Sequence, residues 1–153
     1  MRPRALLTLL LWLSACVGPA PGSEALPAGP SVEVFRLEAG PLLEKRCGDA
    51  SCHGVADRPF ALYASGRRRA ALSDTFLNTP LTAAEVDANL DAVLGFLETP
   101  AARDSTLLQK ALGAQGHGGG SVFAHVTDPE FRALERAFSE AEAGDPSGRT
   151  TSD

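Results

Sequence analysis

The chain of 153 residues is poor in methionine, cysteine and histidine. Its single methionine is Met1, so a chain that has lost its start residue has no methionine sulfur to offer a metal. Sulfur and imidazole chemistry is then confined to three cysteines and three histidines. These are Cys16, Cys47, Cys52, His53, His117 and His125.

Positive charge is also scarce. Lysine and arginine number 14 against 19 acidic residues, for a net charge of −5. An acidic domain of this size is a poor nucleic-acid binder, because such binding needs a basic face that displaces counterions. The one basic run, Arg67–Arg69, is interpreted as a solvated surface. We therefore expect no nucleic-acid partner.

No long hydrophobic run is present. The most apolar stretch covers residues 5–13, whereas a membrane-spanning helix needs roughly 20 residues. Arg2 and Arg4 precede this stretch, and a basic start followed by a short apolar core is typical of a secretory signal. We expect residues 1–15 to be this signal, and its two arginines take the net charge to −7 when it is removed.

The signal ends in Leu13-Ser14-Ala15-Cys16, which resembles a bacterial lipobox. The resemblance implies cleavage before Cys16 and diacylglycerol on its thiol. Val17 follows in place of the Asp that would favour inner-membrane retention, so an outer-membrane location facing the periplasm is expected. The alternative is an ordinary signal peptide with an incidental cysteine.

Composition divides the rest of the chain into three parts. Residues 16–33 are rich in proline and glycine and predict a lipidated cysteine with a semi-extended tether. Residues 34–142 carry the apolar periodicity of one folded domain. Residues 143–153 have no apolar anchor and are expected to be disordered.

The folded part is predicted to be all-α, with sizeable loops at 54–80 and 113–127. A short amphipathic helix over 41–46 leads into Cys47, and the most strand-like piece is 32–35. Thr82 and Glu85 form a capping box for a helix with apolar residues up to Leu97, stopped by Pro100. Further helices begin at Ser105, closing near Gly113, and at Asp128-Pro129, ending at Gly144.

The segment Cys47-Gly-Asp-Ala-Ser-Cys52-His53-Gly54 carries the chemistry. Two thiols followed at once by a histidine are the pattern of covalent haem attachment. Each cysteine forms a thioether with a haem vinyl group, and the imidazole of His53 binds the iron. Four residues separate the cysteines here instead of two, and Gly48, Asp49 and Ser51 are residues that tolerate the extra turn.

The order of motifs resembles planctomycete-type cytochrome c domains. Ser51-Cys-His-Gly54 is followed by Ser105-Thr-Leu-Leu-Gln-Lys110, then His117-Gly-Gly-Gly120 and a final helix over 128–134. The resemblance covers about residues 38–140 and implies a small cytochrome c-like helical domain with one covalent haem c. Where the family often has a tryptophan near the end of its last helix, this chain has Ala137 and Phe138.

Without methionine, the sixth position on the iron must hold histidine, lysine, water or an amine, or stay empty. His117 is the first candidate, because the three glycines after it let the backbone pass close to a flat macrocycle. His125 is the second candidate and Lys110 a distant third. His117 and His125 could also be loop histidines without a ligand role, the latter partly buried.

Other interpretations of the same residues stay open. Cys47 and Cys52 could form a disulfide, or could join His53 and His117 around zinc. Arg58 or the Arg67–Arg69 run could pair with haem propionates. The larger apolar side chains are expected to line the haem or fill the core: Phe60, Leu62, Phe76, Leu108 and Phe123.

The predicted function is electron transfer by a membrane-anchored, periplasm-facing c-type cytochrome with periplasmic or membrane redox partners. A haem-based ligand-binding or sensing module and a haem-free, disulfide-stapled structural lipoprotein are the alternatives. Asp87 and Asp91 lie on the polar face of a predicted helix, where solvation is expected rather than catalysis. Since no phosphate loop, nucleophile elbow or metalloprotease motif is present, we do not expect a stand-alone enzyme.

Overall fold

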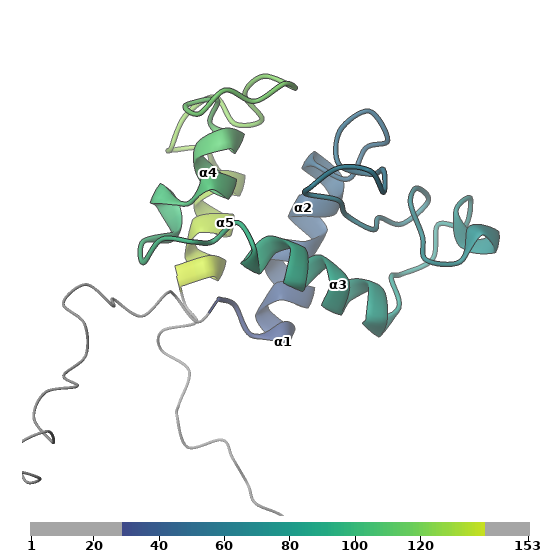
Figure 1. The fold of residues 1–153 in the computed structure, drawn as a ribbon. Helices are drawn as coiled ribbons and strands as arrows, with labels where there is room; N and C mark the ends of the chain where they lie inside the picture. The colour runs from purple at the N-terminus through teal and green to yellow at the C-terminus, as the bar shows by residue number, and fades with distance from the viewer. Residues whose placement is uncertain (1–28, 140–153) are drawn as a thin grey trace, which may run out of the picture.

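The computed structural model describes residues 29–139, and the regular elements of this part are all helical (Figure 1). The predicted all-α class is therefore confirmed. The predicted signal, Cys16, nearly all of the tether and the tail lie outside the described residues, as does the helix end expected at Gly144. None of the helices in the described part has the length and apolar character that crossing a membrane requires.

The first helical stretch starts earlier than predicted. Helix α1 (Val32–Val34), a π-helical segment (Phe35–Ala39) and helix α2 (Gly40–Arg46) follow one another without a break. Ser31 caps the start, because its hydroxyl accepts a hydrogen bond from the Val34 amide at 3.2 Å. Residues 32–35, the most strand-like piece of the sequence, are therefore helical, because a cap starts the helix and the helix continues into α2.

A proline explains the π-helical segment. Pro41 has no amide hydrogen to give to the preceding turn, and its ring crowds that turn. The Gly40 amide instead bonds the carbonyl of Phe35, five residues earlier. A Cβ on Gly40 would lie only 2.9 Å from this carbonyl oxygen, so glycine is needed where the helix widens.

Helix α3 (Ala83–Leu94) begins as predicted and ends early. Thr82 and Glu85 form the expected reciprocal capping box. The helix stops at Leu94, so Pro100 is not its end; Leu97 remains buried in the turn that follows. The buried face also carries a polar residue, Asn89. Its Oδ1 accepts a hydrogen bond from the Tyr63 amide at 2.7 Å, and its Nδ2 donates to the Tyr63 carbonyl at 2.9 Å.

The prediction that the basic run Arg67–Arg69 is solvated is wrong for Arg69. Arg69 is buried, and its guanidinium pairs with the buried Glu85 carboxylate at 2.9 Å. The same carboxylate accepts hydrogen bonds from the amides of Ala70 and Thr82 at 2.7 and 2.8 Å. The Arg69 hydrogen bond is the main reason that the pKa of Glu85 falls from its ordinary 4.5 to about 2.

Two helices complete the domain. A 3₁₀ turn (Ala102–Asp104) leads to α4 (Thr106–Ala111), whose first turn is capped by Ser105 as predicted. Helix α5 (Pro129–Ser139) follows Asp128, and the Asp128 carboxylate accepts hydrogen bonds from the Glu130 and Phe131 amides. A second 3₁₀ turn (Leu72–Asp74) lies inside the long loop after Gly54.

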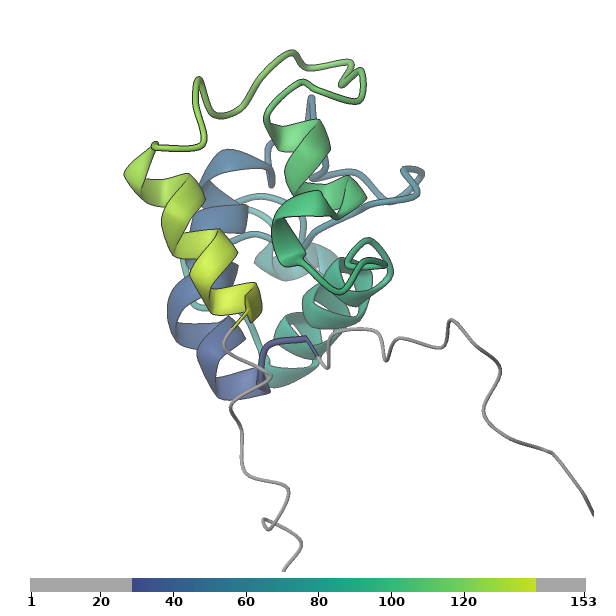
Figure 2. The ribbon, with the colours of Figure 1, turned by 90° about the vertical axis from the view of Figure 1, so that its left-hand side faces the viewer.

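The core lies where the N-terminal and C-terminal helices meet. Helix α5 packs along the π-helical segment, and α3 crosses beneath α1 and α2 (Figures 1 and 2). The rings of Phe123 and Phe131 meet edge to face with their centroids 5.7 Å apart. Fully buried large side chains fill the interior: Phe35, Leu62, Val93, Leu108, Phe123, Phe131, Leu134 and Phe138.

Candidate haem-attachment site

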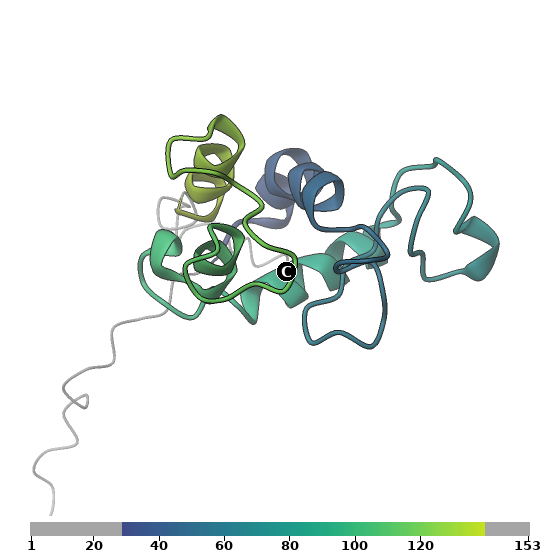
Figure 3. The ribbon, with the colours of Figure 1, turned by 90° about the horizontal axis from the view of Figure 1, so that it is seen from above.

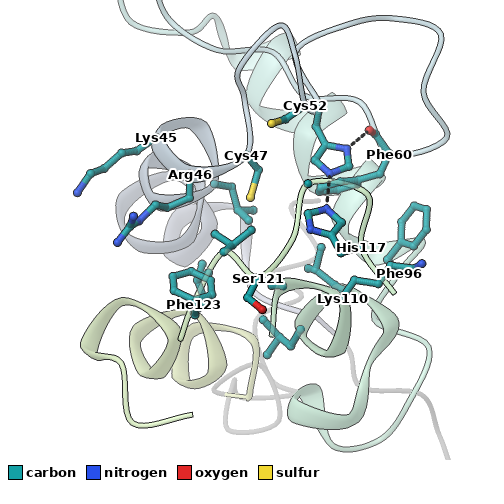
Figure 4. A pocket seen from close by; sticks show the side chains of 18 residues that line it. Lys45, Arg46, Cys47, Cys52, Phe60, Phe96, Lys110, His117, Ser121 and Phe123 are labelled. Atoms are coloured by element: carbon teal, nitrogen blue, oxygen red, sulfur yellow. Dashed lines mark hydrogen bonds between the residues drawn. The ribbon is translucent and has the colours of Figure 1, made fainter. Parts of the chain in front are cut away.

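A pocket of about 360 Å³ opens between α2, α4 and the loops around them (Figure 4). Its volume falls within the range of about 300–1,000 Å³ that is usual for small-molecule sites. The sequence-predicted residues Cys47, Cys52, His53 and His117 all line it. Apolar side chains make up much of the remaining wall: Leu43, Phe60, Phe96, Leu107, Leu108, Val122, Phe123 and Leu134.

The segment from Cys47 to Gly54 folds into a compact turn. The Asp49 carboxylate accepts hydrogen bonds from the amide and hydroxyl of Ser51 at 2.9 and 2.7 Å, and the Asp49 carbonyl accepts from the Cys52 and Gly54 amides. A Cβ on Gly54 would stand 2.4 Å from the Gly48 carbonyl oxygen. Glycine at position 54 is therefore a packing requirement, and backbone hydrogen bonds to Asp49 hold the extra residues between the cysteines.

This turn places His53 at the end of α2. The His53 amide donates to the Cys47 carbonyl at 3.0 Å, and the Leu62 amide donates to the His53 carbonyl at 2.7 Å. The ring stands edge to face against Phe60, with centroids 4.8 Å apart. Its Nδ1 lies 2.8 Å from the Phe60 carbonyl oxygen, so in the neutral ring Nδ1 carries the hydrogen. Nε2 is then unprotonated, and its lone pair is free to accept a hydrogen bond or bind a metal.

His117 reaches the same place from the other side of the pocket. It lies in the glycine-rich loop after α4, and its Nδ1 is 2.7 Å from the Gly120 carbonyl oxygen. The Nδ1 hydrogen of this ring is therefore also engaged, which leaves Nε2 as an acceptor. In both histidines, a backbone carbonyl fixes the tautomer and the direction in which Nε2 points.

The two imidazoles face each other through these nitrogens. Nε2 of His53 and Nε2 of His117 are 3.5 Å apart, and the ring planes differ by 13°. The centroids are 5.8 Å apart, farther than the nitrogens, so the rings meet edge to edge at Nε2 rather than face over face. Two lone pairs aimed at each other repel unless a proton or a metal cation lies between them.

Burial affects two of the site residues. It is the main cause that lowers the pKa of His53 below its ordinary 6.5, which favours the neutral imidazole that binds metals. It also raises the pKa of the Cys47 thiol to about 11. Cys47 is thus a protonated thiol at neutral pH when no group is bound to it.

The structure weighs against the two haem-free interpretations. Cys47 and Cys52 are both free thiols, not a disulfide. Within residues 29–139, no group of three or more histidine, cysteine or acidic side chains is arranged to hold a metal ion. The structure therefore gives no support to a zinc site made of Cys47, Cys52, His53 and His117.

Several other predicted site residues lie elsewhere. His125 is exposed rather than partly buried, and it does not line the pocket. Phe76 is 92% exposed and belongs neither to the pocket nor to the core. Arg58 donates to the Ser51 carbonyl at 3.3 Å, outside the pocket. Lys110 does line it.

The rim of the pocket holds cations that the sequence reasoning passed over. Lys45 and Arg46 are exposed, and both contact the Glu130 carboxylate of α5, the lysine at 2.7 Å. The Arg46 guanidinium also lies 5.7 Å from the centre of the Phe123 ring. The sequence could have indicated these rim residues, because Lys45 and Arg46 directly precede Cys47 at the end of an amphipathic helix.

Phe96 is a second residue that was missed. It follows α3, where the sequence pattern predicted continued helix, and its ring lies edge to face against Phe60 at 5.4 Å. Phe60 in turn packs on His53. Phe96 therefore supports the histidine indirectly, and only the early end of α3 brings it there.

Comparisons of the chain with protein-family models, curated proteins and solved structures find no match. What the pocket does must therefore be argued from its own geometry.

Proposed function

We propose that this protein binds one haem c covalently through Cys47 and Cys52, with His53 and His117 as the two axial ligands, and transfers electrons. The observation that carries the proposal is the pair of facing imidazoles beside two free thiols in one apolar pocket. Haem iron would supply one-electron chemistry at this place. The proposal includes a cytochrome c-like fold.

The separation of the imidazole nitrogens supports one metal between them. Metal–imidazole bonds are about 2 Å long, so a single metal needs about 4 Å between its two nitrogens. The two Nε2 atoms are 3.5 Å apart, and a widening of about half an ångström meets this need. His117 has room for such a shift, because Cβ atoms built on Gly116, Gly118 and Gly120 meet no atom within 4 Å.

The chain's own residues perform three tasks in this proposal. The carbonyls of Phe60 and Gly120 hold the Nδ1 hydrogens and aim both Nε2 lone pairs. Apolar side chains exclude water and so help to set the reduction potential. Lys45 and Arg46 place positive charge at the rim, where it suits acidic groups of a bound molecule.

A ligand-binding role is the second candidate, and the loop of His117 favours it. This loop has few packing constraints at its glycines, and Gly116 and Gly120 have positive φ of 63° and 75°. A histidine on so lightly packed a loop can leave its position more easily than His53, which is held by Phe60. Departure of His117 would open a site for carbon monoxide or nitric oxide.

The test of haem attachment is chemical. The full chain is produced in a bacterium that has c-type haem maturation, and the denatured, washed protein is examined by pyridine haemochrome spectroscopy. We expect haem to remain with the polypeptide. A colourless protein would refute the proposal and leave a haem-free structural role.

Matched variants locate the attachment. Cys47→Ala and Cys52→Ala each remove one predicted thioether and should shift the haemochrome band, whereas His125→Ala should leave it unchanged. Carbon monoxide separates the two haem functions: binding by the reduced wild-type protein, with His117 displaced, would favour the sensing role. No carbon monoxide spectrum in wild type, with one appearing in His117→Ala, would support electron transfer.

Location is part of the same proposal. The lipobox-like residues before Cys16 support a lipid anchor on a bacterial membrane, with the domain facing the periplasm. Mass spectrometry of the mature N-terminus should find an acylated Cys16. An unmodified Cys16 would remove the anchor while leaving haem attachment untouched.

A further inference from the structure

The loop of residues 65–80 holds apolar side chains in solvent. Leu72 is 87% exposed, Phe76 92% and Leu77 48%. The loop projects away from the helical body beyond the start of α3, which Figures 1 and 3 show from two directions. Full burial of one such side chain is worth about 1.5–3 kcal/mol, so three together mark a surface that fits an apolar environment.

The loop is ordered despite this exposure. The Ser65 hydroxyl donates to the Thr79 carbonyl at 2.8 Å, and the Gly66 amide donates to the Leu77 carbonyl at 3.1 Å. The buried Arg69 guanidinium also donates to the Thr79 carbonyl, at 3.2 Å. These bonds close the neck of the loop and keep its tip from folding back onto the core, as in Ω-loops.

Positive charge lies at the neck of the loop rather than at its tip, where Asp74 is the charged residue. Arg67 donates to the Glu44 carbonyl at 3.0 Å, and the Arg68 guanidinium lies 4.0 Å from the centre of the Tyr63 ring. Within residues 29–139, neither arginine forms a salt bridge with a carboxylate. Both arginines are half-buried and precede the exposed Leu72 and Phe76 in the same loop. Positive charge in a loop with an apolar tip is the combination that suits an anionic lipid surface.

We propose that the tip of this loop, residues 70–77, inserts into the headgroup region of an anionic lipid bilayer and orients the domain on the membrane. This rests on the lipid anchor that the proposed function places at Cys16. Twelve residues lie between Cys16 and Gly29, where the described chain begins, and the thirteen steps of about 3 Å reach about 40 Å.

The position of the pocket favours lipid over a redox partner. No residue between 61 and 95 lines the pocket of Cys47 and His117, so a partner that exchanges electrons there does not need this loop. An anchored domain with a second, weak contact to the same surface would be held in one orientation instead of rotating freely on its tether. Two membrane contacts also bind more stably than one acyl chain alone.

Tryptophan fluorescence tests the insertion. Trp12 is the only tryptophan and lies in the predicted signal, so a Trp12→Phe background leaves a new tryptophan as the sole reporter. Phe76→Trp places it at the loop tip, and Leu37→Trp is the matched control, since Leu37 is 60% exposed in the π-helical segment. Each full-length protein is reconstituted into phosphatidylethanolamine–phosphatidylglycerol vesicles whose acyl chains carry bromine near the headgroups.

We expect blue-shifted emission and several-fold stronger bromine quenching at position 76 than at position 37. Adding Arg67→Gln and Arg68→Gln, or replacing the lipid by phosphatidylcholine, should weaken the quenching at position 76. Equal quenching at the two positions would overturn the proposal. A blue shift at position 76 without vesicles that disappears on dilution would also overturn it, because a second copy of the chain would then cover the loop.

The same samples separate this proposal from the haem proposal. Pyridine haemochrome spectra report haem attachment, and the mass of the mature N-terminus reports the anchor. Quenching at position 76 in a protein without haem would leave the loop contact standing. An acylated, haem-loaded protein without quenching would refute the loop contact alone.

Discussion

Breaking the buried pair of Arg69 and Glu85 should destabilise the folded protein strongly. Glu85→Gln keeps the shape of the side chain but turns one acceptor oxygen into a donor. That change leaves the Arg69 guanidinium, whose side chain is 1% exposed, without its counter-charge. Breaking a buried ion pair costs about 3–5 kcal/mol, a large share of the 5–15 kcal/mol that stabilises a domain.

Urea unfolding followed by circular dichroism measures this loss. With a slope of about 2 kcal/mol per molar urea, the midpoint should fall by about 2 M. Asp87→Asn, at an exposed position of the same helix, is the matched control and should change the stability by less than about 0.5 kcal/mol. Arg69→Met combined with Glu85→Leu should recover much of the loss, because no charge is then left unpaired.

The pair also predicts a pH dependence. The pKa of Glu85 in the folded protein is about 2, below its ordinary 4.5. Its contribution to stability is therefore complete above about pH 4.5 and is lost as the pH falls toward 2. The stability difference between wild type and Glu85→Gln should shrink over this interval. Equal stability of Glu85→Gln and Asp87→Asn at neutral pH, or a difference that does not change with pH, would refute the reasoning.

Three further variants test the site and the fold. His117→Ala should convert a low-spin haem spectrum to a high-spin one while His125→Ala leaves it low-spin; a low-spin His117→Ala protein would assign the ligand elsewhere. Asp128→Ala removes the cap of α5 and should cost about 1 kcal/mol in urea unfolding, and unchanged stability would contradict the cap. Phe131→Ala empties a fully buried position and should cost about 3–5 kcal/mol. Phe76→Ala, at an exposed position, should cost less than about 0.5 kcal/mol; similar losses in both would contradict the assigned core.

Local signals in the sequence located most helix starts. The capping box at Thr82, the Ser105 cap and the Asp128-Pro129 start involve residues within a few positions of one another, so the sequence alone contains the interaction. Helix ends were harder to predict. The early end of α3 at Leu94 is followed by Gly95, a stop signal that the apolar pattern up to Leu97 outweighed in the prediction.

Long-range contacts account for the other errors. Arg69 belongs to a basic run that looks solvated until Glu85, 16 residues later, is folded over it. Phe76 looks like a core residue by type, and only the closed neck of its loop keeps it in solvent. Neither outcome follows from residue type or from periodicity.

The candidate site also combines features that the sequence showed with features that only the tertiary structure decided. The sequence by itself left metal chemistry without an internal methionine, placed Cys47, Cys52 and His53 in one short segment, and predicted helices around them. Only the tertiary structure brought His117, 64 residues away, to within 3.5 Å of His53, and left His125 in solvent. The physical reason is that the carbonyls of Phe60 and Gly120 orient the two rings, and such contacts exist only after the loops have closed on the core.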